Sequence, residues 1–242
     1  MTKNIDTIFY DVGSTLRLSV DDPEFSRAAK KEMMELLGIT EPMDEFFKWL
    51  DANHKKYRDW TKVSFLDHSE AEQWMFHMMP DYPDKVKLAE LAPRLTTLYR
   101  DADGRRISNF GAVETVTELN RRGYKQGIIA NTITETEIPN WAIEEKIIQY
   151  FGAIIPSGKV RIRKPDPAIY LLAARVLDSK PENCVYVGDN PKRDIDGTFD
   201  AGFGMMILIK RTKPEDNMAP PKYDANYRIE KLTDLLDIFP PR

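Results

Sequence analysis

The hydrophobic positions of this chain follow two different periods. Residues 5–11 form a short β-prone run that ends in an aspartate, and after Val12 a Gly-Ser-Thr turn follows. Short apolar runs bounded by turn residues are typical of β-strands. From about residue 17 to residue 107 the apolar side chains instead recur at the spacing of amphipathic helices. The pattern therefore predicts one strand followed by a long stretch that is helical throughout.

After about residue 108, strand-like and helix-like segments alternate. Strands that alternate with helices form a mostly parallel sheet with right-handed crossovers. The sequence therefore predicts an α/β fold in which the helical stretch is an insertion after the first strand, and a loop over residues 211–224. The further strands are expected at 126–130, 152–156, 184–187, 205–209 and 227–229, and the helices at 113–119, 141–150, 167–177, 193–201 and 230–239.

Composition narrows the class of protein. The 242 residues are 42% hydrophobic and 31% charged, which is typical of a soluble globular protein with a sizeable core. The formal net charge of -4 argues against a general nucleic-acid binder, which would carry a basic face. No apolar run is long enough for a membrane span, no secretory leader is recognised, and the single Cys184 excludes an internal disulfide. We therefore expect a cytoplasmic enzyme or binding protein that contacts neither nucleic acid nor membrane.

Polar residues that could carry chemistry follow four of the expected strands. Since the carboxyl ends of parallel strands meet at one edge of a sheet, we expect these side chains to lie close together. Carboxylates, a lysine and an amide at one edge suit an anionic substrate held with a hard cation such as Mg²⁺. A carboxylate can also act as a nucleophile toward a phosphoryl group. The residues are Asp11 with Thr15, Asn131 with Thr132, Lys164, and Asp189 with Asp194.

The order of these segments resembles a known family. The segments are DVGSTL at 11–16, IIANT at 128–132, RKPDPAIY at 163–170 and VGDNPKRD at 187–194. Together they resemble the haloacid dehalogenase superfamily of hydrolases, in particular the members whose helical cap is inserted directly after the first motif. The resemblance implies a Rossmann-like α/β core of residues 1–16 and 108–242 and an all-helical cap of residues 17–107.

The same resemblance implies an activity and a role for each motif residue. It implies a Mg²⁺-dependent hydrolase, most simply a phosphatase, that acts on a small phosphorylated metabolite through an aspartyl-phosphate intermediate. Asp11 would be the nucleophile, and Lys164 would steady both the nucleophile and the phosphate. The implied metal ligands are Asp11, the Gly13 carbonyl, Asp189 and Asp194, and the implied substrate contacts are Asn131, Thr132 and Lys164.

Two departures from the family pattern leave other functions open. Gly13 stands where family phosphatases have a second aspartate that protonates the leaving group, and Ala130 stands where they usually have Ser or Thr. Loss of a general acid–base group typically slows a reaction about 10²–10⁴-fold, so slow hydrolysis is expected. The alternatives are a non-catalytic protein that binds phosphorylated ligands, and a phosphonatase or dehalogenase. The intact GD-x4-D pattern at 188–194 favours a metal-dependent phosphoryl site over a dehalogenase.

Overall fold

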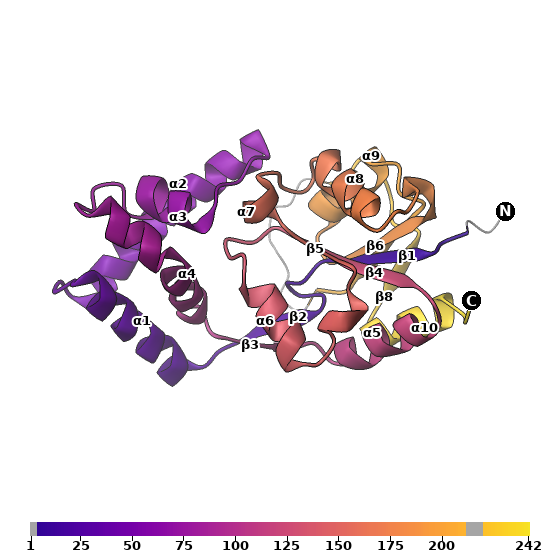
Figure 1. Ribbon diagram of the computed structural model, residues 1–242, viewed down its shortest axis with the longest axis horizontal. Coiled ribbons are helices and arrows are strands. Elements are labelled where there is room, and N and C mark those ends of the chain that lie inside the picture. Colours follow the sequence, from indigo (N-terminus) through magenta and orange to yellow (C-terminus); the bar gives the residue numbers. More distant parts are fainter. Residues whose placement is uncertain (1–3, 212–219) are drawn as a thin grey trace.

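A parallel β-sheet forms the centre of the molecule. The structure is a computed structural model, and it describes residues 4–211 and 220–242 (Figure 1). The sheet has six strands in the order β5-β4-β1-β6-β7-β8, and every neighbouring pair is parallel. The α/β class predicted from the sequence is therefore confirmed. The strands are β1 (Thr7–Tyr10), β4 (Lys125–Ala130), β5 (Ala153–Pro156), β6 (Cys184–Gly188), β7 (Met205–Ile209) and β8 (Tyr227–Ile229).

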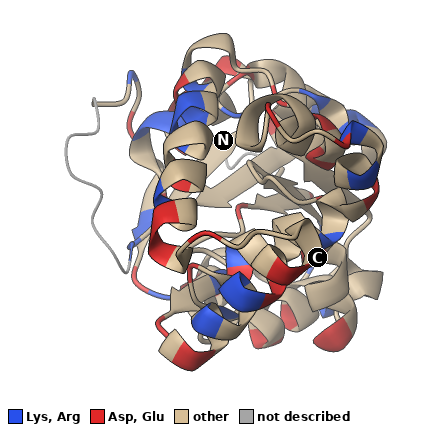
Figure 2. Ribbon diagram, turned by 90° about the vertical axis from the view of Figure 1, so that its left-hand side faces the viewer, with Lys and Arg blue, Asp and Glu red and all other residues tan. Residues whose placement is uncertain are grey.

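Helices cover both faces of this sheet. Successive side chains of a strand point to opposite faces, so Ile8 and Tyr10 pack into one apolar cluster and Phe9 into the other. Charged side chains lie mostly on the helices, with both signs interspersed, whereas the strands of the sheet are largely uncharged (Figure 2). The helices on the first face are α5 (Ala112–Arg121), α6 (Glu137–Glu144) and α10 (Leu235–Ile238), and those on the second are α7 (Ser157–Val160), α8 (Pro167–Val176) and α9 (Asp196–Asp200).

A separate group of helices lies beside the sheet rather than on its faces (Figure 1). It has its own apolar cluster, in which Met33, Leu50 and Leu88 are fully buried. The first helix begins where the Asp22 side chain accepts a hydrogen bond from the Phe25 amide, as N-cap residues do. The helices are α1 (Pro23–Leu37), α2 (Met43–Ser64), α3 (Glu70–Gln73) and α4 (Lys85–Asp101), with a π-helical turn at Trp74–Met78.

The prediction of helix throughout 17–107 is wrong at both ends. Residues Arg17–Val20 form β2 and Arg105–Ser108 form β3, and the two strands pair antiparallel as a small second sheet. Each strand has only four residues and mixes polar with apolar side chains, so an alternating pattern is too short to stand out beside the helical periodicity of the residues between them. Their pairing joins chain segments that are far apart in sequence, and it forms the connection between the helical group and the central sheet (Figure 1).

Three predicted helices are shorter or interrupted. The helix expected at 141–150 ends at Glu144, because Lys146 adopts a left-handed backbone conformation with a φ of 59°. Short helical turns replace parts of the other two helices, at Pro191–Ile195 before α9 and at Leu232–Asp234 before α10.

Of the loop expected at 211–224, residues 212–219 lie outside the described residues, and the rest form neither helix nor strand. Among the described residues, no helix is both long and apolar enough to cross a membrane.

Candidate active site

The sheet brings the predicted motif residues to one edge. Asp11 follows β1, and its amide donates a 2.8 Å hydrogen bond to the Val187 carbonyl, which extends the pairing of β1 with β6. Asp189 follows β6 directly, and Lys164 lies between β5 and α8. Asp11, Lys164 and Asp189 are each no more than 5% exposed, and Asp194 is fully buried. Four charged groups are therefore enclosed together at the carboxyl end of the sheet.

The Lys164 ammonium group is the cation at the centre of this cluster. Its Nζ lies 2.9 Å from Asp11 Oδ1 and 3.2 Å from Asp194 Oδ1. It also donates to the hydroxyl of Tyr186, which in turn donates to the Ile129 carbonyl at 2.8 Å. Burial raises the pKa of Tyr186, so its hydroxyl stays protonated and fixes the lysine from the sheet side. Tyr186 was missed in the sequence, although a tyrosine inside a buried strand needs a hydrogen-bond partner.

Asn131 holds the Lys164 loop in place. Its Oδ1 accepts a 2.9 Å hydrogen bond from the Lys164 amide, and its Nδ2 donates a 2.9 Å bond to the Lys164 carbonyl. The Thr132 amide donates to Ser157 Oγ at 3.0 Å, and the Thr132 hydroxyl accepts from the Thr134 amide at 3.2 Å. The Asn131 side chain and the Thr132 backbone amide therefore connect the end of β4 to the neighbouring loops.

Three carboxylates lie close enough to share a cation. Asp11, Asp189 and Asp194 each present an oxygen within 4.8 Å of those of the other two. Burial, together with the negative charges of Asp11 and Asp194, raises the pKa of Asp189 to about 7. Burial also opposes ionisation of Asp194, but the positive charges of Arg193 and Lys164 outweigh it and lower its pKa. An all-oxygen, negatively charged set of this kind fits a hard cation such as Mg²⁺, which would relieve the repulsion between the carboxylates.

Two arginines of the cluster were not assigned to the site from the sequence. Arg193 Nη2 lies 2.7 Å from Asp11 Oδ2 and 3.5 Å from Asp189 Oδ1, and its Nε lies 2.8 Å from Asp194 Oδ1. Arg211 is the first residue of the predicted loop, and its Nε lies 3.0 Å from Asp189 Oδ2. For Arg193 the sequence did contain a signal, because this residue lies inside the GD-x4-D pattern.

The two departures from the family pattern leave room at the site. A Cβ added at Gly13 would meet no atom within 4 Å, so a side chain can begin there without a clash at its first carbon. Gly13 and Ala130 both line a cavity of about 210 Å³ that also contains Asp11. The position of the family's second aspartate thus borders an open cavity in this chain.

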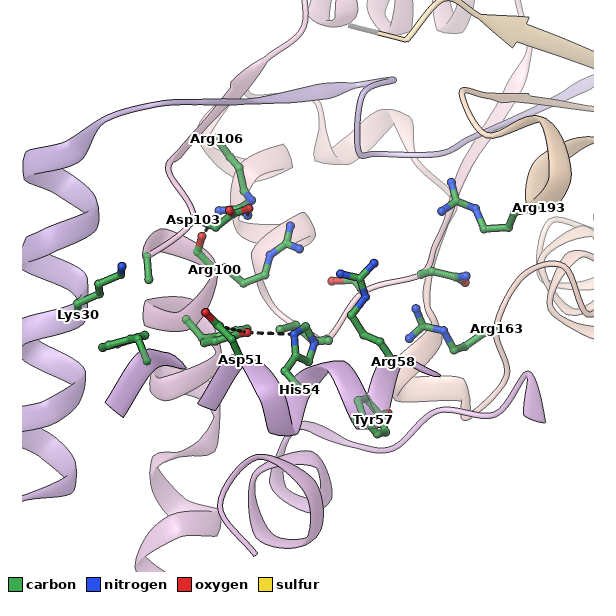
Figure 3. A pocket seen from close by; sticks show the side chains of 16 residues that line it. Lys30, Asp51, His54, Tyr57, Arg58, Arg100, Asp103, Arg106, Arg163 and Arg193 are labelled. Carbon is green, nitrogen blue, oxygen red and sulfur yellow. Dashed lines mark hydrogen bonds and ion pairs between the residues drawn. The ribbon is translucent and has the colours of Figure 1, made fainter. Parts of the chain in front are cut away.

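A second and larger cavity adjoins this one. It has a volume of about 520 Å³ and lies between α2, α4 and the loops at the edge of the sheet (Figure 3). The two cavities share four wall residues, so a ligand bound beside Asp11 can extend toward the helical group. The shared residues are Arg100, Arg106, Asn131 and Thr132.

The three histidines have different surroundings. His54 lines the larger cavity, where its Nδ1 lies 3.0 Å from the Tyr99 hydroxyl. His68 Nδ1 and His77 Nε2 lie 3.0 Å apart and stack beside Trp60, and neither histidine lines the two cavities at the site. Of the three, His54 alone is therefore placed to meet a ligand in these cavities.

Known proteins support the family suggested by the motifs. A family model described as haloacid dehalogenase-like hydrolase matches residues 5–202. A glyceraldehyde 3-phosphate phosphatase from Methanopyrus kandleri is 32% identical over 133 residues, which cover 52% of this chain and 54% of that relative. Pyrophosphatase PpaX from Bacillus thuringiensis is 29% identical over 64% of this chain and 70% of its own length. The chain thus spans about half of the first of these curated relatives.

Solved structures show the same fold. A 2-haloacid dehalogenase from Pseudomonas syringae pv. Tomato DC3000 matches with a TM-score of 0.68, at 19% identity and over 97% of both chains. The likeness extends over the helical group as well as the sheet, because nearly the whole chain is covered. With the family model matching most of its length, the chain belongs to the haloacid dehalogenase-like hydrolases.

Proposed function

We propose that this protein is a Mg²⁺-dependent phosphatase that acts on a small phosphorylated molecule through a phosphoryl group transferred to Asp11. The observation that carries the proposal is the position of the Asp11 carboxylate, which follows the carboxyl end of β1 and lines the smaller cavity. One of its oxygens lies 2.9 Å from the buried Lys164 ammonium group, and the cluster includes two further carboxylates. The phosphatase names of the two curated relatives support phosphate-ester or phosphate-anhydride hydrolysis.

In the proposed reaction, a carboxylate oxygen of Asp11 attacks phosphorus, and the bond from phosphorus to the leaving oxygen breaks. The leaving group takes a proton from water, since Gly13 offers no side chain to supply one. Water then attacks the phosphorus of the aspartyl phosphate, which releases inorganic phosphate and restores the Asp11 carboxylate. Lys164 orients Asp11 throughout and stabilises the negative charge that develops on the phosphoryl oxygens.

The three carboxylates would hold the metal ion. Asp11, Asp189 and Asp194 are the proposed side-chain ligands, and the backbone carbonyl of Gly13 is the proposed fourth. A bound Mg²⁺ would neutralise charge on the phosphoryl group. Arg193 pairs with all three of these carboxylates, so cation binding would compete with this arginine.

The helical group, with its proposed limits at residues 17 and 107, would act as the cap over this site. The larger cavity separates it from the edge of the sheet, so a substrate would meet side chains of α2 and α4 as well as the motif residues. Lys30 lines this cavity, with its Nζ 5.1 Å from the centre of the Phe47 ring. A lysine at this place keeps phosphonate cleavage, in which a lysine forms a Schiff base with substrate, as a second candidate reaction.

A non-catalytic binding function is the other candidate. Gly13 and Ala130 favour it, because each removes a side chain that family phosphatases use. Such a protein would bind phosphate esters at the same edge of the sheet without turning them over.

The test is hydrolysis of p-nitrophenyl phosphate with and without Mg²⁺, by the wild type and by Asp11→Asn. Asp200→Asn is a matched control, because Asp200 pairs with Lys222 on the surface. We expect metal-dependent hydrolysis that falls by at least about 10³-fold in Asp11→Asn and is unchanged in the control. Equal activity of wild type and Asp11→Asn, or activity independent of metal, would exclude the proposed mechanism.

A further inference from the structure

The larger cavity has an excess of positive charge. Its wall contains six basic side chains and two acidic ones, Asp51 and Asp103. In Figure 3 several guanidinium groups project into the space between α2 and the core. The basic residues are Lys30, Arg58, Arg100, Arg106, Arg163 and Arg193.

Some of these charges are already neutralised. Arg163 Nη1 lies 2.6 Å from Asp67 Oδ2, a fully buried carboxylate that connects the cap to the core. Arg193 pairs with the carboxylates around Asp11. These two arginines therefore contribute little to the excess, which must come from the remaining basic residues.

Three arginines share a single carboxylate where the cap joins the core. Glu137 accepts from Arg17 Nη1 and from Arg100 Nε, both at 2.8 Å, and Arg106 Nε lies 3.7 Å from the same carboxylate. Arg106 also pairs with Asp103 at 3.5 Å, but the Asp103 side chain is 83% exposed. Three positive charges therefore face one largely buried carboxylate and one that is largely in solvent, so the cluster has an excess of positive charge.

Arg58 adds an unpaired charge from the opposite wall. It lies on α2, and among the described residues no carboxylate forms an ion pair with it. Burial and this positive charge lower the pKa of two neighbouring groups, His54 and Arg106. Burial first, and then Arg58, Arg163 and Arg100, lower the pKa of His54 to about 4. Burial and the neighbouring Arg100 likewise lower the pKa of Arg106 to about 10.

We propose that this cavity binds a second anionic group of the substrate, a carboxylate or a second phosphate, through Arg58, Arg100 and Arg106. The inference rests on the proposed hydrolysis at Asp11 and names the substrate class for it. Arg100 and Arg106 line both the cavity at Asp11 and the larger one. A small molecule with its phosphoryl group at Asp11 therefore reaches these arginines with a charged group at its other end.

The first test compares substrates that differ in that distal group. With Mg²⁺ present, we would measure kcat/KM for 3-phosphoglycerate against glycerol 3-phosphate, and for fructose 1,6-bisphosphate against fructose 1-phosphate. A charge-assisted hydrogen bond contributes enough to favour the anionic member of a pair by about tenfold to a hundredfold. A preference in the first pair identifies a carboxylate, and one in the second pair a phosphate. Preference in neither pair overturns the proposal.

The second test assigns the preference to the arginines. In Arg58→Gln and Arg100→Gln, we expect the preference for the anionic member to fall at least about tenfold. Arg58 is exposed and unpaired among the described residues, so its substitution leaves the fold intact even where Arg100→Gln perturbs the Glu137 cluster. Arg94→Gln is the matched control, because Arg94 lies on the same helix as Arg100 and pairs with Glu32 on the surface. An unchanged preference in both cavity variants overturns the assignment.

A binding measurement separates this inference from the proposed reaction. Asp11→Asn would be titrated calorimetrically with 3-phosphoglycerate and with glycerol 3-phosphate, and again in the Arg58→Gln background. If 3-phosphoglycerate binds more tightly than glycerol 3-phosphate and this difference depends on Arg58, the subsite is supported even if the wild type proves inactive. Hydrolysis of p-nitrophenyl phosphate without any such discrimination leaves the phosphatase intact and removes the subsite.

Discussion

The two sides of the proposed substrate site differ in how their charges are arranged. At the edge of the sheet, Asp11, Asp189 and Asp194 are packed around Lys164 and Arg193, and each carboxylate has a positively charged partner. On the cap side, basic residues outnumber acidic ones, and several arginines share one glutamate. The first arrangement is suited to holding a cation and reacting with phosphorus, and the second to recognising a further anion.

The two sides also differ in what holds them in place. The acidic side is built on strand ends in the interior of the sheet, where burial makes each charge depend on its partner. The basic side is built on α2, α4 and the short strands β2 and β3, and several of its side chains are partly exposed. Substitutions on the acidic side should therefore affect chemistry and stability, whereas those on the basic side should affect substrate choice.

The largest expected effect is a gain of activity in Gly13→Asp. A Cβ at this position meets no neighbour, and the added carboxyl group would supply the proton that the leaving group otherwise takes from water. A restored general acid–base group is worth about 10²–10⁴-fold in rate, measured as kcat with p-nitrophenyl phosphate. Gly13→Asn is the control of equal size. Equal kcat values for Gly13→Asp and Gly13→Asn would mean that a missing proton donor is not what limits the rate.

Lys164→Met tests the mutual dependence of the buried charges. Removal of the buried ammonium group leaves Arg193 as the remaining cation that Asp11 and Asp194 share, and each carboxylate loses one buried partner. This loss should lower the free energy of unfolding by about 3–5 kcal/mol in the absence of metal. Urea unfolding measures this loss. Lys210→Met should cost less than about 1 kcal/mol, because Lys210 pairs with Glu230 on the surface. Similar losses in the two variants would contradict the description of Lys164 as a buried partner.

The pH dependence of stability tests the excess charge on the basic side. The pKa of His54 falls from its ordinary 6.5 to about 4 in the folded protein, so between these values the unfolded chain binds a proton that the folded one does not. Stability therefore decreases as the pH falls through this window, by about 1–2 kcal/mol between pH 6.5 and pH 5. The groups around His54 are Asp51, Arg58, Tyr99, Arg100 and Arg163.

Urea unfolding at several pH values checks this expectation in the wild type and in His54→Gln. The variant should lack the part of the pH dependence that His54 contributes, so its stability should decrease less over the same window. Equal pH dependence in the two proteins would mean that His54 is not held neutral by burial and by the arginines.

The smallest expected effect concerns competition for the carboxylates. Arg193→Gln removes a positive charge from Asp11 and Asp194, so Mg²⁺ should stabilise the variant more than it stabilises the wild type. A difference of about 1 kcal/mol corresponds to roughly 2–4 °C in Tm for a chain of this size. Thermal unfolding with and without Mg²⁺ measures it, with Arg121→Gln on the surface as the control. A smaller Mg²⁺ shift in Arg193→Gln would mean that the arginine supports cation binding rather than competing with it.

The sequence was most informative about the sheet. The apolar runs that became β4, β6 and β7 could be located within a residue or two, because buried parallel strands are apolar on both faces. In a parallel sheet the carboxyl ends of β1 and β6 lie at one edge, which predicts the proximity of Asp11 and Asp189 from topology alone. The strands β2 and β3 were missed because each is only four residues long and its partner is distant in sequence.

The cap side of the site could not be predicted in the same way. Arg58 and Arg100 lie on amphipathic helices, where periodicity indicates the apolar face and leaves polar residues looking like ordinary solvated positions. Which of these polar residues meets the core depends on the packing of the cap against the sheet. Arg211 was missed for a related reason. It follows β7 and Asp189 follows β6, so their contact depends on how the segments after the two strands fold.

The most direct test of the proposed reaction is the mass of the protein itself. Wild-type protein with Mg²⁺ and p-nitrophenyl phosphate would be quenched in acid during turnover, digested, and analysed by mass spectrometry. Because Gly13 provides no group to activate water, we predict an intermediate that accumulates, seen as one added phosphoryl group on the peptide that contains Asp11 and absent from Asp11→Asn. Hydrolysis that proceeds with no phosphoryl group ever found on Asp11 would contradict the proposed role of this aspartate.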